Sequence, residues 1–349
     1  SLSLGNLTRD LISIDSVTGN EDAILEYIDD YLKKSGYIKK ITLHEGGLVA
    51  GDHDGSAVVA LVGHVDTVPI SNNQLSLDES NAIYGRGAVD MKSGIAVMIE
   101  CLINFQEKNI VGVFYKGEEG LKEHNGLETL FPVLNENFDI SFGIIFEPTN
   151  NEVQLGCQGV VNAALRIIGE EAHSARPWLG DNAIYKSIPV LEKLNELAPE
   201  PVLVDELEYK EVINATTISG GNAKNVIPGE VLFNINYRFS PDKTNDDAVE
   251  SLNKFFSPFG ELTITDVAES AYPHKNDDNI QKFIDFTSTN VEPKQAWTDV
   301  ARFTSEGIPA INFGPGDPEL AHKANENVPL TDIEDCYELI KKYLQKGVE

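Results

Sequence analysis

Short apolar runs alternate with amphipathic segments along the first 155 residues of the chain. The runs at residues 57–63, 110–115 and 142–146 are rich in β-branched and aromatic side chains and have the length of buried strands. The segment at 90–106 places its apolar residues at helical spacing and is predicted to form an amphipathic helix. This alternation of strands with helices indicates a parallel sheet joined by right-handed crossover connections.

The pattern changes near residue 160 and changes back near residue 270. Between these points the predicted order is strand, helix, strand, strand, which is typical of a small α+β domain. The further elements expected are a helix pair at 7–35, a strand at 160–168, a helix at 181–197 begun by Asp181-Asn182, strands at 215–219 and 231–239, a helix at 277–289, a strand at 308–313 and a closing helix at 331–345. We therefore expect an α/β fold, with a mixed sheet and helices on both of its faces, formed by residues 1–159 and 271–349 and interrupted by an α+β domain at 160–270.

The chain is strongly acidic. It has 27 lysines and arginines against 56 aspartates and glutamates, which gives a net charge of −29. Such a charge repels phosphate, so we expect neither nucleic acid nor an anionic membrane surface as a partner. No apolar run approaches the ~20 residues of a membrane span, and no signal-peptide pattern is visible, so a cytoplasmic location is expected. The cysteines, Cys101, Cys157 and Cys336, form no closely spaced pair and are expected to be buried thiols.

Side chains that commonly bind metals follow the first three predicted strands at the points where these strands end. His64 and Asp66 come after the first strand, Glu118 and Glu119 after the second, and Glu147 after the third. Because ligands of open α/β sheets bind beyond the carboxyl ends of the strands, we expect these side chains to lie together. Imidazole and carboxylate ligands in one place are typical of a zinc site.

The His64–Asp66 pair, and a further aspartate at position 90, each have an ordinary structural interpretation when taken alone. His64-Val65-Asp66 places both polar side chains on one face of a strand end, but such a pair is more often a structural hydrogen bond. Asp90 follows the glycine-rich stretch Gly85-Arg86-Gly87 and precedes the predicted helix. Taken alone, Asp90 is favoured as the N-cap of that helix.

The pair Glu118-Glu119 is harder to explain without a cation. Two carboxylates that face one site repel each other, and a metal ion would relieve one of them. The other would then have a raised pKa, which suits a general base near neutral pH. His322 also lies beyond a predicted strand, the one at 308–313. Taken jointly, the polar residues at the strand ends favour a catalytic metal centre.

Five short motifs together resemble those of a family of two-domain dinuclear zinc metallopeptidases and deacylases, which includes acetylornithine deacetylase, aminoacylases and succinyl-diaminopimelate desuccinylase. The motifs are Gly63-His64-Val65-Asp66-Thr67-Val68-Pro69, Gly85-Arg86-Gly87 with Asp90-Met91-Lys92, Glu118-Glu119-Gly120, Glu147-Pro148-Thr149 and Ala321-His322-Lys323. Within the family, the chain most resembles the actinobacterial type of succinyl-diaminopimelate desuccinylase, through residues 173–182, 297–303 and 312–318. Residues 297–303 depart from the Gly-Thr-Ser-Asp-Gly-Arg-Phe stretch of the more widespread form.

The resemblance implies a centre of two Zn²⁺ ions, for which Co²⁺ or Mn²⁺ can substitute. The implied ligands are His64, Asp90 and Glu147 for one ion, and Asp90, Glu119 and His322 for the other. Asp90 would thus bridge the two ions. Glu118 would be the general base, and Asp66 would orient the imidazole of His64.

The resemblance also implies that the domain at 160–270 is a lid through which a homodimer forms. His173 would then reach the active site of the partner subunit and polarise the scissile carbonyl. The residues implied to bind the substrate are Arg176, Asn225, Arg238, Thr298 and Arg302. The arginines suit carboxylate groups because guanidinium pairs with them bidentately, although a structural salt bridge is an equal alternative for each.

The implied substrate is a small anionic N-acyl amino acid. N-succinyl-LL-diaminopimelate, hydrolysed to succinate and LL-diaminopimelate in lysine biosynthesis, is the first expectation. Alternatives with the same chemistry are an acetylornithine or acetyl-lysine deacetylase and a di- or tripeptidase. Alternatives of another class are a non-catalytic protein stabilised by metal and an acidic cation-binding protein. The presence of Glu118 together with all five ligand positions favours an enzyme.

Overall fold

The computed structural model of the chain describes residues 2–75, 78–79 and 81–349. The chain folds into two compact units. Unit 1 comprises the residues up to Leu155 together with His274–Glu292 and Arg302–Glu349. Unit 2 comprises Gly156–Pro273 and Pro293–Ala301. The second of these segments, which carries Thr298, lies in the range that the sequence pattern had placed with unit 1.

Unit 1 is built on an eight-stranded mixed sheet with the order β1-β2-β6-β3-β7-β17-β8-β16. Its strands are β1 (Ile41–His44), β2 (Gly47–Ala50), β3 (Ala57–His64), β6 (Ile110–Tyr115), β7 (Asp139–Ile145), β8 (Val153–Leu155), β16 (Val291–Pro293) and β17 (Ala310–Asn312). The central strands β6, β3, β7 and β17 run parallel, whereas β1, β2 and β8 pair antiparallel. A mixed sheet, as predicted, therefore carries parallel strands at its centre, where both faces are buried.

Helices pack on both faces of this sheet, and the contacts around two glycines show which helix lies against each face. In β3, a Cβ on Gly63 would meet side chains of α3 (Ser93–Asn104), whereas in β7 a Cβ on Gly143 would meet Phe303 of α9 (Val300–Ser305). Ala60 is the register partner of Gly143, so Gly63, three residues further along β3, points to the opposite face. Phe142 faces the α3 side and contacts Tyr343 of α10 (Leu330–Gly347). The predicted helices on both faces are confirmed.

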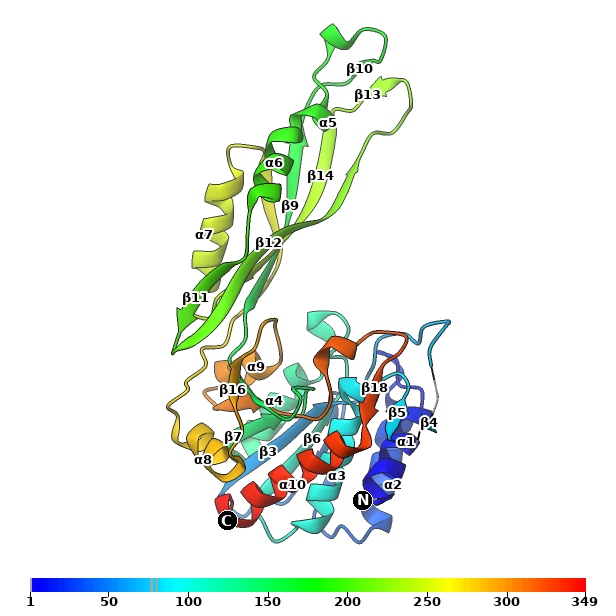
Figure 1. Cartoon of the computed structure of the whole chain (residues 1–349), viewed down its shortest axis with the longest axis vertical. Helices are drawn as coiled ribbons and strands as arrows, with labels where there is room; N and C mark the ends of the chain where they lie inside the picture. The colour runs from blue at the N-terminus through cyan, green and yellow to red at the C-terminus, as the bar shows by residue number, and fades with distance from the viewer. Residues whose placement is uncertain (1, 76–77, 80) are drawn as a thin grey trace. The chain divides into compact units, whose positions relative to one another are not determined.

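The remaining elements of unit 1 lie around this sheet (Figure 1). They are α1 (Leu2–Ser13), α2 (Asp22–Lys34), α4 (Leu127–Asn137), α8 (Asp278–Thr287), the short sheet of β4 (Asp78–Glu79), β5 (Ala82–Tyr84) and β18 (Asn327–Pro329), and the helical turns η1 (Ala88–Lys92), η2 (Lys122–His124) and η4 (Pro318–Leu320). In α2 the apolar face is buried through Ile24, Leu25, Ile28 and Leu32, as the sequence pattern predicted.

Unit 2 is a five-stranded antiparallel sheet with the order β11-β12-β14-β9-β15. Its elements are β9 (Gly159–Ile168), β10 (Ala172–His173), η3 (Pro177–Leu179), α5 (Ala183–Lys186), α6 (Ile188–Glu196), β11 (Glu200–Val204), β12 (Leu207–Gly220), β13 (Val226–Ile227), β14 (Glu230–Phe239), α7 (Asn245–Phe256) and β15 (Glu261–Ala268). The core forms between the sheet and helices α5, α6 and α7. Asn182 caps α5, as expected, but the predicted single helix at 181–197 is broken at Ser187.

One edge of the unit 2 sheet is open. β11 covers β12 only as far as Glu211, whereas β14 pairs with β12 from Val212 to Gly220. Over those residues β12 therefore has a neighbour on one side only among the strands of this sheet. Residues 214–220 are exposed, and Ile218 among them has 59% of its surface accessible. An exposed edge of this length is a template for pairing with another strand.

Two further expectations concern the described residues. Cys101, Cys157 and Cys336 are buried free thiols, as predicted. Among the helices of the described residues, none has the length and apolar character needed to cross a membrane.

Candidate metal centre

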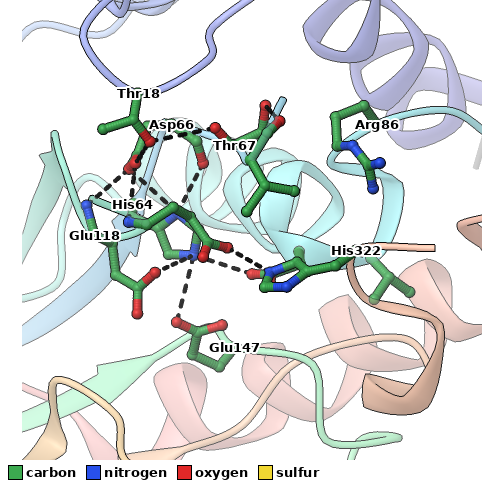
Figure 2. A network of polar contacts seen from close by, with 12 residues as sticks. Thr18, His64, Asp66, Thr67, Arg86, Glu118, Glu147 and His322 are labelled. Atoms are coloured by element: carbon green, nitrogen blue, oxygen red, sulfur yellow. Dashed lines mark hydrogen bonds and ion pairs between the residues drawn. The ribbon is translucent and has the colours of Figure 1, made fainter. Parts of the chain in front are cut away.

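Three neighbouring parallel strands carry four of the predicted site residues to one edge of the unit 1 sheet. His64 is the last residue of β3, Glu118 and Glu119 follow β6, and Glu147 follows β7. β3 lies between β6 and β7 and is parallel to both. The carboxyl ends of the three strands therefore place one imidazole between the carboxylates that follow the flanking strands (Figure 2).

Asp90 and His322 reach the same place from outside the strands. Asp90 lies in η1, which is a π-helical turn in which Asp90 and Met91 have non-helical φ and ψ. Its Oδ1 lies 3.0 Å from Nε2 of His64, and its Oδ2 lies 3.1 Å from Nε2 of His322. The same His322 nitrogen lies 2.9 Å from Oε1 of Glu119. Each oxygen of Asp90 thus faces a different histidine.

The N-cap interpretation of Asp90 is wrong. The helix that follows begins at Ser93 rather than at residue 90, and its N-cap position is occupied by Lys92, without a side-chain cap. The π-helical turn sets the Asp90 carboxylate toward the histidines instead of toward the helix N-terminus. A sequence pattern of apolar residues does not distinguish these two geometries.

The donor set fits a divalent cation. Nε2 of His64 lies 3.0 Å from Asp90, 3.4 Å from Glu147 and 3.8 Å from Glu118, so three carboxylates converge on one ring nitrogen. Two groups, His64 with Asp90 and Glu119, and His64 with Glu118 and Glu147, have ligand atoms close enough to hold a metal ion. One imidazole proton cannot satisfy three carboxylates, whereas a cation among imidazole and carboxylate ligands can.

The pKa shifts of His64 and Glu119 result from the same close packing of carboxylates. Burial would lower the pKa of His64, but the charges of Glu147 and Glu118 and the contacts with Asp66 and Asp90 raise it well above its ordinary value. Burial and the charge of Asp90 together raise the pKa of Glu119 to about 7, against the opposing contact with His322. These directions are those expected of carboxylates packed together with too little positive charge.

Asp66 holds the loop that carries Glu118 and Glu119. Its Oδ1 accepts a hydrogen bond from the backbone N–H of Glu118, and its Oδ2 accepts one from the backbone N–H of Glu119, both at 3.0 Å. Nδ1 of His64 lies 2.9 Å from the backbone carbonyl oxygen of Asp66 and 3.5 Å from its carboxylate. The contact of Asp66 with His64 is therefore made mainly through the main chain.

Four residues that sequence reasoning did not select also contact this site. Thr18 donates its hydroxyl to Oδ2 of Asp66 at 2.7 Å (Figure 2). Glu21 accepts a hydrogen bond from the backbone N–H of Gly117 at 3.2 Å. Arg86 and Glu326 form a buried ion pair at 2.9 Å. Thr18 and Glu21 lie outside the motifs from which the site is predicted. Arg86 had been noted only as part of a motif, because tertiary partners cannot be identified from spacing along one chain.

The predicted residues of unit 2 lie at separate places within that unit. His173 ends β10, pairs with Val226 of β13, and accepts a hydrogen bond at Nδ1 from the backbone N–H of Ala175 at 3.0 Å. The backbone of Asn225 accepts a hydrogen bond from Ser174, next to His173. Arg238 lies near the far end of β14. His173 and Asn225 are exposed, whereas Arg238 is half-buried.

The arginines differ in their surroundings. Arg302, in unit 1, pairs with the carboxylate of Glu128 and donates to the backbone carbonyl of Lys122. Among the described residues, neither Arg176 nor Arg238 has a salt-bridge partner. Thr298 is buried, and its hydroxyl has no hydrogen-bond partner in the part of the chain that the structure describes.

Comparison with known proteins supports the resemblance seen in the motifs. Residues 60–346 match the family described as Peptidase family M20/M25/M40. A Corynebacterium glutamicum protein named succinyl-diaminopimelate desuccinylase is 34% identical over 352 residues, which cover 97% of this chain and 95% of the relative. A Mycobacterium tuberculosis protein, to which the same name is provisionally given, is 36% identical over 342 residues, or 97% of each chain.

The fold is shared with solved structures. A crystal structure of a tripeptidase from Staphylococcus aureus covers 99% of this chain and 97% of that chain, with a TM-score of 0.77 and 22% sequence identity. At that identity the likeness is one of fold. The family match spans most of the sequence, and the relatives align over nearly its whole length. The chain therefore belongs to Peptidase family M20/M25/M40 and is a hydrolase of amide bonds.

Proposed function

We propose that the chain removes the succinyl group from N-succinyl-LL-diaminopimelate in the cytoplasm, releasing succinate and LL-diaminopimelate. The observation that carries this proposal is the convergence of two histidines and four carboxylates at one edge of the unit 1 sheet, in a chain that aligns nearly end to end with relatives of that name. The convergence supports the chemistry, and the relatives support the substrate.

Two zinc ions are the proposed cofactors. His64, Asp90 and Glu147 would hold one ion, and Asp90, Glu119 and His322 the other. The bridging role of Asp90 is supported by its two oxygens, each of which faces a different histidine. When bound, the ions would polarise the scissile carbonyl and lower the pKa of the attacking water.

Glu118 is the proposed general base. Its carboxylate lies 3.8 Å from Nε2 of His64, farther than those of Asp90 and Glu147, which supports a place beside the ligand set rather than within it. The carboxylate would take a proton from the attacking water and return it to the leaving amine nitrogen. Asp66 would position Glu118 by binding its backbone N–H.

A homodimer is the proposed active form, and the length of β14 supports it. Asn225 precedes β14, whereas Arg238 lies near its end, eight residues beyond Glu230. Eight residues of strand span ~27 Å, whereas a substrate of about tripeptide size spans only ~10 Å. If both residues bind one substrate molecule, they must come from different subunits.

The open edge of β12 offers a surface for such a dimer. From Val212 to Gly220 this strand has unpaired backbone groups on one side within its sheet, so two copies can pair edge to edge about a two-fold axis. In the dimer, His173 would act on the partner's substrate. The residues that would contribute to binding the substrate carboxylates are Arg176, Asn225, Arg238, Thr298 and Arg302, and Asn225 and Arg238 would reach the same substrate from different subunits.

The test is a substrate panel with enzyme reconstituted with zinc. Succinyl-diaminopimelate, acetylornithine, acetyl-lysine and a set of di- and tripeptides would be compared by kcat/KM. We expect succinyl-diaminopimelate to be hydrolysed with the highest kcat/KM, and chelation of the metal to abolish that activity. A higher kcat/KM for an acetylated substrate or a peptide would overturn the substrate assignment, whereas full activity without metal would overturn the mechanism.

A further inference from the structure

A buried ion pair, Arg86–Glu326, connects the backbone segments that carry two of the proposed metal ligands, Asp90 and His322. Arg86 and Glu326 are 6% and 1% exposed, and their Nη1 and Oε1 atoms are 2.9 Å apart. Neither residue has a place in the proposed mechanism. A buried pair of this kind adds little net stability compared with apolar residues, so stability alone does not explain its presence at this place.

Glu326 holds the main chain of the turn that presents Asp90. Its second oxygen, Oε2, accepts hydrogen bonds from the backbone N–H groups of Val89 at 3.0 Å and of Asp90 at 3.2 Å. The turn is not regular helix at this point, since Asp90 and Met91 have non-helical φ and ψ. These N–H groups consequently depend on a side chain, and Glu326 supplies it.

Arg86 holds the loop that presents His322. Its Nη1 donates to the backbone carbonyl of Lys323 at 3.3 Å, in addition to the contact with Glu326. Its remaining nitrogens donate to the backbone carbonyl of Pro69 at 3.1 Å and to the hydroxyl of Ser71 at 2.9 Å. His322 itself has a φ of 66°, in the left-handed region, where a histidine needs support from its surroundings.

We propose that the Arg86–Glu326 pair sets the distance between Asp90 and His322 and thereby the affinity of the metal site that these two residues share. The inference rests on the proposed ligand set. Asp90 and His322 are distant in sequence and lie in a turn and a loop, and the nearest strand pairing between their segments, that of β5 with β18, ends at Tyr84 and Asn327. His64 and Glu147, by contrast, are placed by adjacent parallel strands that pair in register. In the site that contains His322, both Asp90 and His322 are held through the pair, whereas in the other site only Asp90 is.

The experiment is a chelator-competition titration of metal-free protein with Zn²⁺, carried out on the full chain. Glu326→Gln and Arg86→Lys are compared with the wild type. A glutamine has a single acceptor oxygen and cannot serve both Arg86 and the N–H groups, and a lysine cannot reproduce the fork of the guanidinium. We expect two ions in the wild type and, in both variants, a loss of affinity of ~10–100-fold at one site, as found for residues that orient ligands. The other site should lose less affinity, because only Asp90 among its ligands is held through the pair, whereas His64 and Glu147 are placed by paired strands.

Glu211→Gln is the matched control. Glu211 is also buried, and it also accepts a backbone N–H, that of Ser240 at 2.7 Å, and pairs with a cation, Lys243, but it lies in unit 2. We expect both metal affinities of this variant to equal those of the wild type. Because the readout is the ratio of two affinities in one protein, a general loss of stability does not imitate the expected result.

Each other outcome overturns a definite statement. A wild type that binds fewer than two ions overturns the proposed ligand set and the inference with it. Two ions in the wild type, with an unchanged ratio of affinities in folded Glu326→Gln and Arg86→Lys, overturns the inference alone. Equal losses at both sites, or the same change in Glu211→Gln, likewise overturn it and leave the ligand set intact.

Discussion

The two units of this chain arrange their polar residues in opposite ways. In unit 1 the candidate residues contact one another, as His64, Asp90 and His322 do through two carboxylate oxygens. In unit 2 His173 and Asn225 are exposed, and Arg238 has no salt-bridge partner among the described residues. The site of unit 1 is thus assembled by the fold of a single chain, whereas the candidate residues of unit 2 are not brought together by the fold of that unit.

The difference has an energetic side. Carboxylates that converge on one imidazole repel one another, so the unit 1 site is preorganised at a cost that a bound cation removes. An exposed histidine and a half-buried arginine carry no comparable electrostatic strain. Substitution of the proposed metal ligands of unit 1 should consequently alter metal binding, whereas substitution of His173 in unit 2 should alter turnover and leave the metal content unchanged.

The largest effect is expected for Asp90→Ala. Its two oxygens face different histidines, so the loss of one side chain should empty both proposed metal sites and reduce activity to background. Metal analysis of the purified variant is the measurement, with Asp332→Ala, an aspartate elsewhere in unit 1, as the control that keeps both ions. One ion remaining at full occupancy would show that Asp90 does not bridge.

Glu118→Ala should have the next largest effect, by separating catalysis from metal binding. A general base typically contributes ~10²–10⁴-fold to the rate, so kcat should fall by about that factor while two ions remain bound. Glu119→Ala, the adjacent carboxylate, should instead lose metal because it contacts His322. Metal content and kcat of the two variants are measured side by side, and equal metal loss in both would contradict the division of roles.

The strands that place the unit 1 site could be predicted because their signal is local. The apolar run at 110–115 coincides with β6, and side chains that follow such runs meet at one sheet edge whatever the details of packing. The position of Asp90 could not be predicted in the same way. Its π-helical turn is held by the carboxylate of Glu326, 236 residues away along the chain, and no pattern near Asp90 contains that information.

Unit 2 was predicted less completely. Its strands β9 and β14 were recognised from apolar alternation, but α7 was not predicted, although Ala248, Leu252 and Phe256 follow helical spacing and Thr244 forms a capping box with Asp247. A single helix between polar loops, such as α7, gives a weaker periodic pattern of apolar residues than a run of strands that alternate with helices. The partners of His173 and Arg238 are not determined by the chain itself, so neither sequence nor fold assigns them.

A third, smaller effect is expected for His173→Ala. Loss of one donor to the developing oxyanion typically costs ~3–4 kcal/mol, and metal content should stay at the wild-type level because His173 lies in unit 2. Mixing this variant with Glu118→Ala tests action between subunits. Hybrid dimers would contain one intact site, so activity should return up to about a quarter to a half of the wild-type value for a two-fold dimer. Verified hybrids that stay inactive would exclude the transfer of His173 between subunits.

Thr18→Val is expected to have the smallest effect. It also tests most directly how unit 1 positions Glu118, the proposed general base. The substitution keeps the shape of the side chain and removes the hydroxyl that donates to Asp66 at 2.7 Å. Asp66 keeps its hydrogen bonds from the backbone N–H groups of Glu118 and Glu119, so the loop should loosen rather than unfold. We expect kcat to fall about tenfold, which corresponds to ~1.4 kcal/mol, with KM and metal content unchanged. Thr287→Val, which removes a hydroxyl bonded to a helix carbonyl elsewhere in unit 1, is the control. Metal loss in proportion to activity, or a kcat equal to that of the control, would show that the Thr18 hydroxyl does not position Glu118 through Asp66.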